Sequence, residues 1–369
     1  MNEALAEAIS LTDELVGDAP QEWDRVGRIP VDLLQSLGTK GILCAQVPAA
    51  FGGPGLDSAH NGELTAHVGA VCSSLRSVMT SQGMAAWAIQ RLGDTAHHGA
   101  FLPRLTGGEL AAVAFSEAGA GSDLSAMATR IVPDGDHVVI DGAKVWITAA
   151  AYADLLIVFG AYESDAAAVV VPTSTPGVRI EPLSDVLGCR AAGHSAIEFS
   201  RVRVPASYVL PGAGQPAALL VTAALTYGRM SVAWGCVGIL RACLSAAARH
   251  ASTREQFGRR IADHQLVARH LAELVVAEQT ATHACEHAAR CWDDRSPDVV
   301  MATLLAKHIG ATRAVHGAST ALQVLASAGA RNSHVVARAH RDAKLMEIIE
   351  GSSEICQLAL AQHALAVWA

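Results

Sequence analysis

The sequence is poor in charged residues and has no long uninterrupted apolar stretch. Charged residues make up 17% of its 369 residues and hydrophobic residues 51%. It contains no run of about 18 or more apolar residues, which argues against a transmembrane helix. The N-terminus also lacks the basic start and apolar core of a signal peptide. We therefore expect a soluble, cytoplasmic protein with no membrane partner.

The sequence also has few basic residues, no paired cysteine spacing and no cluster of metal-ligand residues. A net charge of −8 leaves no basic face for phosphates, which excludes nucleic acid as a partner. The eight cysteines include no CxxC pair, so we expect reduced core residues rather than disulfides. His283 and His287 lie one helical turn apart, but Cys285 falls on another face and no second ligand cluster appears. We expect no metal site.

Three kinds of sequence pattern divide the chain. Residues 1–112 carry helical periodicity, residues 113–212 consist of short β-branched runs between Gly, Pro and Asp turns, and residues 213–369 hold long Ala/Leu-rich segments with helical periodicity. The pattern predicts an N-terminal helical domain, a middle β domain and a C-terminal helix bundle. The fold class is therefore α+β.

Two motifs of the middle region have side chains suited to a cofactor. "FSEAGAGSD" combines small residues, which allow close backbone approach, with polar Ser116, Ser122 and Asp123. "KVWIT" places Trp146 and Thr148 on one face of a strand by the period of two. The alternatives are a glycine-rich loop capped by Ser or Asp and an ordinary strand.

Two motifs of the C-terminal region also carry chemistry. In "REQFG", Arg254 suits a pyrophosphate and Phe257 an adenine, with Gln265 close behind; the alternative is a helix end with a favourable cation and a glycine cap. In "KLMEIIEGSSEI", Glu350 is a lone carboxylate behind apolar residues. Taken alone, Glu350 could equally be a solvated acid at a helix end.

Seven segments, in their order and spacing, together resemble the acyl-CoA dehydrogenase family from about residue 28 to the end. The resemblance implies an N-terminal helical domain, a middle β-barrel domain, a C-terminal four-helix bundle and FAD held non-covalently between them. It also implies a homodimer or homotetramer. The segments are "AVAFSEAGAGSD", "VIDGAKVWIT", "IEFSRVRVPASYVL", "GRMSVAWGCVG", "STREQFGRRIADHQ", "ALQVLASAG" and "RDAKLMEIIEGSSEI".

The resemblance assigns flavin contacts to the middle region. Phe115 and Ser116 match contacts to the flavin ring, and Ser122 matches a contact near the pyrophosphate. Trp146 and Thr148 match residues beside the flavin, with the Thr148 hydroxyl toward N5.

Further cofactor contacts fall in the C-terminal region. Arg254, Phe257, Gln265 and Gln323 match residues that hold the ADP half of the neighbouring subunit's FAD, and Ser352 is assigned to the cofactor as well. The resemblance therefore implies that a dimer is needed for cofactor binding.

Glu350 matches the catalytic base of the family. The apolar run before it should raise its pKa by desolvation. Its implied task is to remove the α-proton of an acyl thioester while a hydride leaves the β-carbon for flavin N5. Arg229 and Gly351 are assigned to the substrate side of this site. A flavoprotein or oxygen would accept the electrons.

The sequence departs from the family pattern at several positions. Thr226 replaces an Asp that contacts the pantetheine chain, Ala149 begins three alanines where relatives show Asn-Gly-Gly, and Ala326 with Ser327 interrupts a glycine-rich run. Arg76, in "RSVMTSQ", resembles the arginine of glutaryl-CoA dehydrogenases that pairs with the far carboxylate of the acyl chain. A snorkelling surface arginine is the alternative for Arg76.

These departures bear on the substrate. A short polar acyl group and a weakened CoA contact resemble the family members of macrolide polyketide clusters, which help make hydroxymalonyl or methoxymalonyl extender units on an acyl carrier protein. An ordinary short-chain or dicarboxylic acyl-CoA dehydrogenase is one alternative. A flavin monooxygenase on the same fold and a scaffold protein without FAD are two others.

Overall fold

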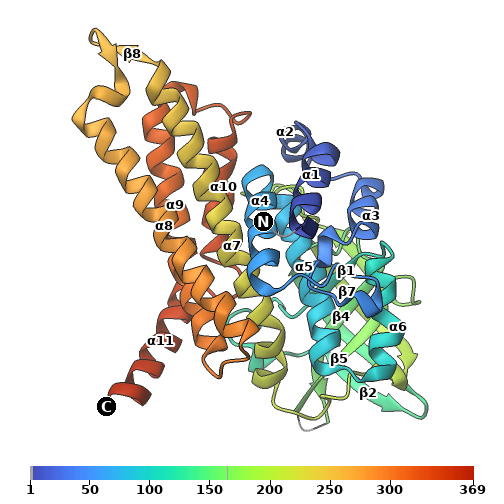
Figure 1. Ribbon diagram of the computed structural model, residues 1–369. Helices are drawn as coiled ribbons and strands as arrows, with labels where there is room; N and C mark the ends of the chain where they lie inside the picture. The colour runs from blue at the N-terminus through green and yellow to red at the C-terminus, as the bar shows by residue number, and fades with distance from the viewer. Residues whose placement is uncertain (1–2, 164) are drawn as a thin grey trace.

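Helices fill the N-terminal part of the computed structural model, which describes residues 3–163 and 165–369 (Figure 1). Helix α5 lies at the centre of this part, with nearly all of its side chains buried, and it packs against α4, α6, α7 and the sheet. The helices are α1 (Glu3–Val16), α2 (Pro20–Val26), α3 (Val31–Thr39), α4 (Ser58–Val71), α5 (Ser73–Leu92) and α6 (Thr95–Thr106), with short 3₁₀ turns η1 (Ile42–Cys44) and η2 (Ala49–Phe51).

Side-chain caps fix where these helices begin. The Asp57 carboxylate accepts a hydrogen bond from the His60 backbone N–H at the start of α4. The Asp94 carboxylate does the same for Ala96 and His97 at the start of α6. Each cap satisfies backbone donors that the first helical turn leaves unpaired.

The middle of the chain forms one seven-stranded sheet. Its strand order is β1-β4-β2-β3-β7-β6, with β5 paired to β4; β4 runs parallel to β1 and β2, and the other pairs are antiparallel. The strands are β1 (Ala111–Ala114), β2 (Arg130–Asp134), β3 (His137–Ile147), β4 (Leu155–Tyr162), β5 (Asp165–Pro172), β6 (Val178–Pro182) and β7 (Ser195–Pro205).

The C-terminal part is a bundle in which α7, α8, α9 and α10 pack together, as expected (Figure 1). A short hairpin of β8 (Glu255–Gln256) and β9 (Arg259–Arg260) joins α7 to α8. The helices are α7 (Ala217–Thr253), α8 (Gln265–Asp293), α9 (Val299–Leu325), α10 (Val335–Met346) and α11 (Ser353–Trp368).

Helix α7 forms the core of this bundle. Among the described residues it is the one helix long and apolar enough to cross a membrane, by length and composition alone, and 78% of its most apolar window is buried inside the protein. Such burial is that of a core helix. The eight cysteines are free and buried, as expected.

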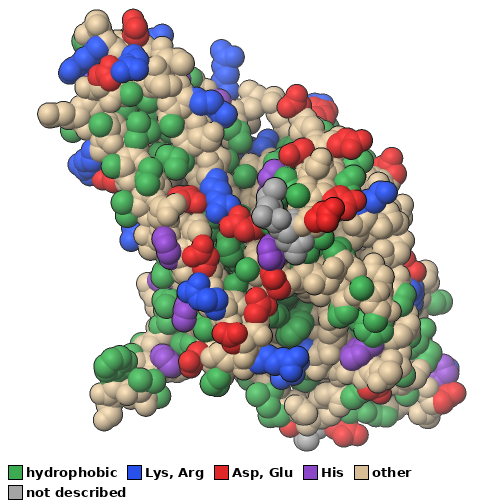
Figure 2. All heavy atoms as spheres, viewed as in Figure 1, with side chains coloured by type: hydrophobic (Ala, Val, Ile, Leu, Met, Phe, Trp, Pro, Cys, Tyr) green, Lys and Arg blue, Asp and Glu red, His purple; other side chains and the backbone are tan. Residues whose placement is uncertain are grey.

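Two surfaces of the bundle remain apolar and uncovered. Figure 2 shows hydrophobic side chains gathered on the outer face of the bundle and on α11, which projects away from the body of the protein in Figure 1. Large exposed apolar side chains on these elements are Leu266, Val275 and Val276 of α8, Leu305 of α9, and Leu358, Leu365, Val367 and Trp368 of α11.

Candidate active site

Glu350 lies in the turn between α10 and α11, and its carboxylate packs against α7. Its backbone is left-handed, with φ of 56°, which a non-glycine residue adopts mainly in tight turns. A Cβ atom on Gly228 of α7 would lie 2.4 Å from Glu350 Oε2. Gly228 therefore provides the space that the carboxylate occupies.

Two cationic side chains hold this turn by its backbone rather than by the carboxylate. Arg229 Nε donates to the Glu350 carbonyl oxygen at 3.1 Å, and Lys307 Nζ donates to the Gly351 carbonyl oxygen at 2.5 Å. Glu350 Oε2 is buried and has no hydrogen-bond partner among the described residues. As expected, burial raises the pKa of Glu350; the charges of Arg229, Lys307 and Arg76 limit the rise. The carboxylate is thus free to accept a proton.

Arg76 of α5 is buried without a carboxylate partner among the described residues. Its side chain is 1% exposed, so it is not a snorkelling surface arginine. Nη1 donates to Thr80 Oγ1 at 3.2 Å, Nη2 contacts Met346 Sδ at 3.0 Å, and Nε has no partner. Thr80 Oγ1 lies 2.7 Å from Ser231 Oγ of α7. Since burying an unpaired guanidinium is costly, this site favours an anionic or oxygen-rich ligand.

One face of α7 aligns Glu350 with Arg76. Gly228 supports the Glu350 carboxylate, Ser231 follows one turn later and Gly235 two turns later. A Cβ atom on Gly235 would lie 2.8 Å from Arg76 Nε. At 1.5 Å per residue, the two glycines are about 10 Å apart along the helix. The Glu350 carboxylate and the Arg76 guanidinium therefore pack against the same short stretch of α7.

A buried ion pair holds the "FSEAGAGSD" loop against β3. Lys144 Nζ lies 2.8 Å from Glu117 Oε1 and donates to the Phe115 carbonyl oxygen at 2.9 Å. The Glu117 carboxylate also accepts from the backbone N–H groups of Ala128 and Thr129. Desolvation opposes ionisation, but these donors outweigh it and bring the pKa of Glu117 to about 2. Sequence reasoning missed this pair.

The predicted cofactor residues of this loop differ in exposure. Phe115 is buried and packs on Phe159, with ring centroids 4.4 Å apart. Ser116 is half-buried, and its carbonyl oxygen accepts from the Val145 N–H at 2.9 Å. Ser122 is exposed. The start of the loop thus belongs to the core, while its glycine-rich part is open to a ligand.

The regular alternation predicted for "KVWIT" is wrong. The β3–β7 register shifts between Lys144 and Ile147, Trp146 has φ of 61°, and Thr148 lies beyond the end of β3. This is a β-bulge. It nevertheless brings the two residues together at His194, whose Nδ1 lies 3.2 Å from Thr148 Oγ1 and whose ring centroid lies 6.1 Å from that of Trp146. The Trp146 side chain is 58% exposed.

Arg254 and Phe257 do not form a glycine-capped helix end, because α7 stops at Thr253 and a hairpin follows. Phe257 and Gly258 both have positive φ, 53° and 77°, as a two-residue hairpin turn requires. Phe257 is 95% exposed. Together with the turn after α9, Arg254 and Phe257 line a groove of about 1090 Å³.

The two glutamines assigned to the cofactor are exposed, but neither Gln265 nor Gln323 is among the residues that line this groove. Their sequence neighbours Leu266 and Val324 do line it. Of the four residues that the resemblance assigns to the ADP half of FAD, the structure therefore brings Arg254 and Phe257 together at the groove.

Other assigned residues have structural partners. Thr226 is buried, and its hydroxyl donates to the Thr222 carbonyl oxygen at 2.7 Å. Ser352 caps α11 by accepting from the Ile355 N–H at 3.4 Å. Two of the departures from the family pattern fall on strained backbone, since Ala149 has φ of 64° and Ala326 has φ of 49° and ψ of −132°.

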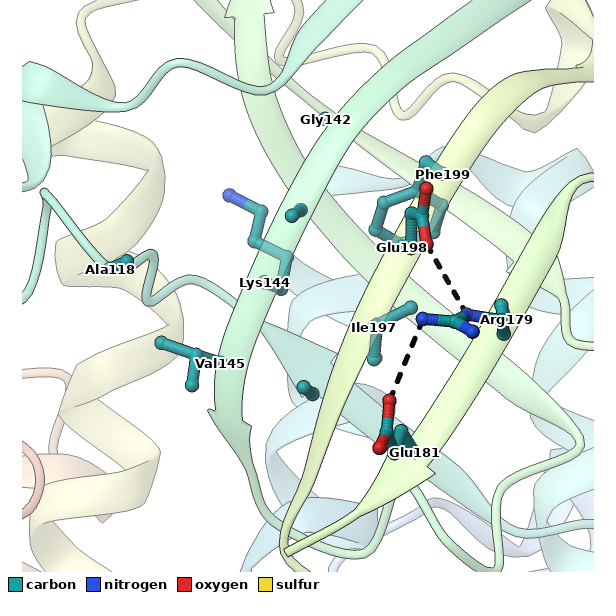
Figure 3. Close-up of a pocket in the computed structure, with 11 residues that line it drawn as sticks. Ala118, Gly142, Lys144, Val145, Arg179, Glu181, Ile197, Glu198 and Phe199 are labelled. Carbon is teal, nitrogen blue, oxygen red and sulfur yellow. Dashed lines mark ion pairs between the residues drawn. The ribbon is translucent and has the colours of Figure 1, made fainter.

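A separate hollow of about 430 Å³ lies on the sheet, where β3, β7 and β6 meet (Figure 3). Its charges are matched: Arg179 pairs with Glu181 at 3.6 Å and with Glu198 at 3.3 Å. The part of the chain that the structure describes contains no group of three or more His, Cys, Asp or Glu side chains able to hold a metal ion. His283 instead contacts the Gln279 carbonyl oxygen of its own helix.

Comparisons with known proteins agree with this geometry. Three family models match the chain: the N-terminal domain of acyl-CoA dehydrogenase over residues 2–109, the middle domain over 112–202 and the C-terminal domain over 218–365. Glutaryl-CoA dehydrogenase of Desulfococcus multivorans is 30% identical over 360 residues, covering 94% of this chain and 91% of the relative.

Two solved structures are similar along their whole length. One is described as FkbI for biosynthesis of the methoxymalonyl extender unit of the polyketide FK520; it is 61% identical, with a TM-score of 0.94, over 97% of this chain and 99% of that one. The other is a glutaryl-CoA dehydrogenase in complex with glutaryl-CoA, 27% identical, with a TM-score of 0.92, over 100% of this chain and 96% of that one.

Proposed function

The chain belongs to the acyl-CoA dehydrogenase family, and we propose that it oxidises an acyl thioester with FAD as cofactor. The observation that carries this proposal is the Glu350 carboxylate, which is buried against Gly228 with a raised pKa and an unpartnered Oε2. A desolvated carboxylate of this kind suits removal of a weakly acidic C–H proton near neutral pH.

In this mechanism Glu350 removes the α-proton of the acyl group. Arg229 and Lys307 bind carbonyl oxygens of the turn, so they hold the base in place without occupying its carboxylate. Their charges also limit the rise of its pKa, which keeps a useful fraction of the base ionised. Bound FAD supplies the acceptor for the hydride that leaves the β-carbon.

The residues around Trp146 fit a flavin. A largely exposed indole, the Thr148 hydroxyl and the unpartnered Nε2 of His194 lie together, which suits a planar ring with a polar edge. Arg254 and Phe257 suit a pyrophosphate and an adenine in the groove of the bundle. We propose that these two residues hold the FAD of a neighbouring subunit.

A homodimer or homotetramer follows from this arrangement. Phe257 stands on the tip of a hairpin with almost its whole ring exposed, and the apolar side chains of α8 and α11 lack a cover among the described residues. A second copy of the chain would bury both surfaces. Light scattering should therefore give at least twice the chain mass of 38.2 kDa.

We propose that Arg76 selects an acyl group of a short polar or acidic class. The guanidinium has an unpartnered Nε, and its Nη1 donates to the Thr80 hydroxyl, which lies 2.7 Å from the Ser231 hydroxyl. The solved relatives are described with a methoxymalonyl unit and with glutaryl-CoA, both dicarboxylic acyl groups. We propose that Arg76 binds a carboxylate or a cluster of oxygens within about 10 Å of the α-carbon, the spacing set by two turns of α7.

We further propose that the acyl group is carried by an acyl carrier protein in polyketide extender-unit biosynthesis. The 61% identity to FkbI supports this pathway. The similarity to glutaryl-CoA dehydrogenase supports the second candidate, oxidation of a dicarboxylic acyl-CoA.

The test is anaerobic reduction of the purified flavoprotein, followed by visible absorbance. Glu350→Gln should keep the flavin but lose its reduction by substrate, by a factor of about 10²–10⁴ for a general base. Glu347→Gln is the matched control, since Glu347 only pairs with Lys344 near the surface. A Glu350→Gln variant whose flavin is still reduced by substrate at the wild-type rate would refute the assignment of Glu350 as the base.

The same assay separates the carriers. Bleaching by a dicarboxylic or hydroxyacyl thioester on the carrier protein alone supports extender-unit biosynthesis, whereas bleaching by the acyl-CoA alone supports the second candidate. Steady oxygen-dependent hydroxylation with reduced flavin would instead favour a monooxygenase.

A further inference from the structure

His194 is a buried imidazole that no assignment above explains. It immediately precedes β7 and is 9% exposed. Its Nδ1 lies 3.2 Å from Thr148 Oγ1, its ring meets Trp146 edge-on, and its Nε2 has no hydrogen-bond partner among the described residues. Both neighbours are residues that the proposed function places beside the flavin.

We propose that His194 is a positioning residue: its Nδ1–H donates to Thr148 Oγ1 and so turns the hydroxyl proton of Thr148 outward, toward the cofactor. This inference rests on the proposed function, because the outward acceptor is the flavin. It concerns residues of this chain only and assigns no new reaction to the cofactor.

The tautomer of His194 decides whether the Thr148 hydroxyl can donate to a ligand. A neutral imidazole has one N–H donor and one bare nitrogen, and a threonine hydroxyl has a single proton. If Nδ1 carried no proton, the Thr148 hydroxyl would donate its single hydrogen bond to His194 and could not donate to another group. If Nδ1 carries the proton, Thr148 Oγ1 accepts from His194 and its own proton stays available.

The surroundings keep the imidazole uncharged. Desolvation and the nearby charge of Arg76 lower the pKa of His194 to about 4. At neutral pH His194 is therefore a neutral ring with one donor, and it adds no positive charge beside Arg76. A neutral ring can fix the Thr148 hydroxyl without binding the anionic end of the substrate.

The first experiment reads the tautomer directly. We would record ¹⁵N spectra of the flavin-bound protein labelled at histidine, and assign the His194 signals by their loss in H194N. The expected result is a protonated Nδ1 and a bare Nε2. A protonated Nε2 with a bare Nδ1 would overturn the proposal, whatever the variants do.

The second experiment uses three substitutions that separate the two ring nitrogens. Asn places an N–H where Nδ1 was, Gln places one where Nε2 was, and Leu removes both. We expect H194N to reduce its flavin within about twofold of the wild type. H194Q and H194L should reduce their flavin up to about tenfold more slowly, which is the rate change that corresponds to the free energy of one oriented hydrogen bond. A rate retained by H194Q and lost in H194N would overturn the proposal.

A double-mutant cycle with T148V distinguishes positioning from a general structural role. If His194 acts through the Thr148 hydroxyl, H194L should add nothing to the rate loss of T148V, and both single variants should shift the flavin absorption band in the same way. Additive losses would overturn the proposal. A protein that binds no FAD would instead refute the proposed function, and the tautomer in that protein would still show whether His194 donates to Thr148.

Discussion

Replacing Gly228 by alanine should displace the Glu350 carboxylate, the proposed base, without removing it. The new Cβ would lie 2.4 Å from Glu350 Oε2 and 2.7 Å from its Cδ. Because non-bonded heavy atoms pack at about 3.5–4.0 Å, the carboxylate must retreat by about 1 Å. A misplacement of that size costs about 100-fold in rate. Alanine also favours a helix over glycine by about 1 kcal/mol, so stability should not fall in parallel.

The assay for G228A is the rate of flavin reduction under anaerobic conditions, with flavin content and melting temperature measured on the same sample. G99A is the matched control, because a Cβ on Gly99 of α6 meets nothing within 4 Å. It should reduce its flavin at the wild-type rate. A G228A variant as fast as the wild type would refute the placement of Glu350 against this glycine.

An alanine at Gly235, two turns further along α7, should change the preference for acidic acyl thioesters rather than the rate of flavin reduction in general. A Cβ on Gly235 would lie 2.8 Å from both Cδ and Nε of Arg76, so G235A should displace the guanidinium and leave Glu350 in place. We expect G235A to lose reduction by acidic acyl thioesters and to retain reduction by uncharged ones. An equal loss of the reduction rate with both substrate classes would show that Arg76 does not select the acyl group.

Four further outcomes follow from the geometry. A326G should relieve about 1 kcal/mol of backbone strain, because Ala326 occupies φ 49° and ψ −132°, and should therefore raise the melting temperature. A328G, at a neighbouring exposed alanine, should not raise it. K144M should lower the free energy of unfolding in urea by about 3–5 kcal/mol by stranding Glu117, and E117Q added to it should recover part of the loss. The pKa of Glu117, about 2, lies below its unfolded value of about 4.3. The ionised Glu117 carboxylate therefore contributes stability above about pH 4.3, and that contribution is lost as pH falls toward 2. Burial lowers the pKa of its partner Lys144, so this contribution comes from the carboxylate and not from the lysine. Because the pKa of Glu350 is raised, flavin reduction should increase as pH rises through a value above the ordinary glutamate range; a flat profile would contradict this.

The order of the elements and the family were predictable from the sequence, because both depend on patterns local in the chain. Helical periodicity and β-branched runs gave the succession of helices, sheet and bundle that the structure shows. The resemblance assigned Arg254, Phe257, Gln265 and Gln323 to one group, and two of them, Arg254 and Phe257, line one groove. Each of these signals can be read within a few residues.

The bulge at Trp146 was not predictable from such patterns. The rule of alternating faces assumes that β3 keeps its register with β7, whereas the pairing slips between Lys144 and Ile147. Nothing in "KVWIT" itself encodes the slip, since β7 supplies the partner residues. For the same reason the sequence did not indicate that His194, at the start of β7, would meet Thr148.

One unused signal was the rarity of lysine. The chain has lysine at only four positions, and two of them, Lys144 and Lys307, are fully buried. Lys144 pairs with Glu117 and Lys307 binds the carbonyl oxygen after Glu350. Two of the four lysines are therefore buried cations, alongside the buried Arg76 and Arg229.

The proposed acyl site is bounded on α7 by two glycines, Gly228 and Gly235, which lack side-chain atoms. Each interior glycine costs a helix about 1 kcal/mol relative to alanine, yet Gly228 and Gly235 lie on one face of a core helix that packs well enough to offset this. Their missing Cβ atoms admit Glu350 from the turn after α10 and Arg76 from α5. Sequence motifs consist of side chains that are present. They therefore indicated Glu350 and Arg76, but not the glycine face of α7 that sets the spacing between them. If that spacing selects the acyl group, specificity should respond to glycine substitutions on α7 as strongly as to changes of Arg76 itself.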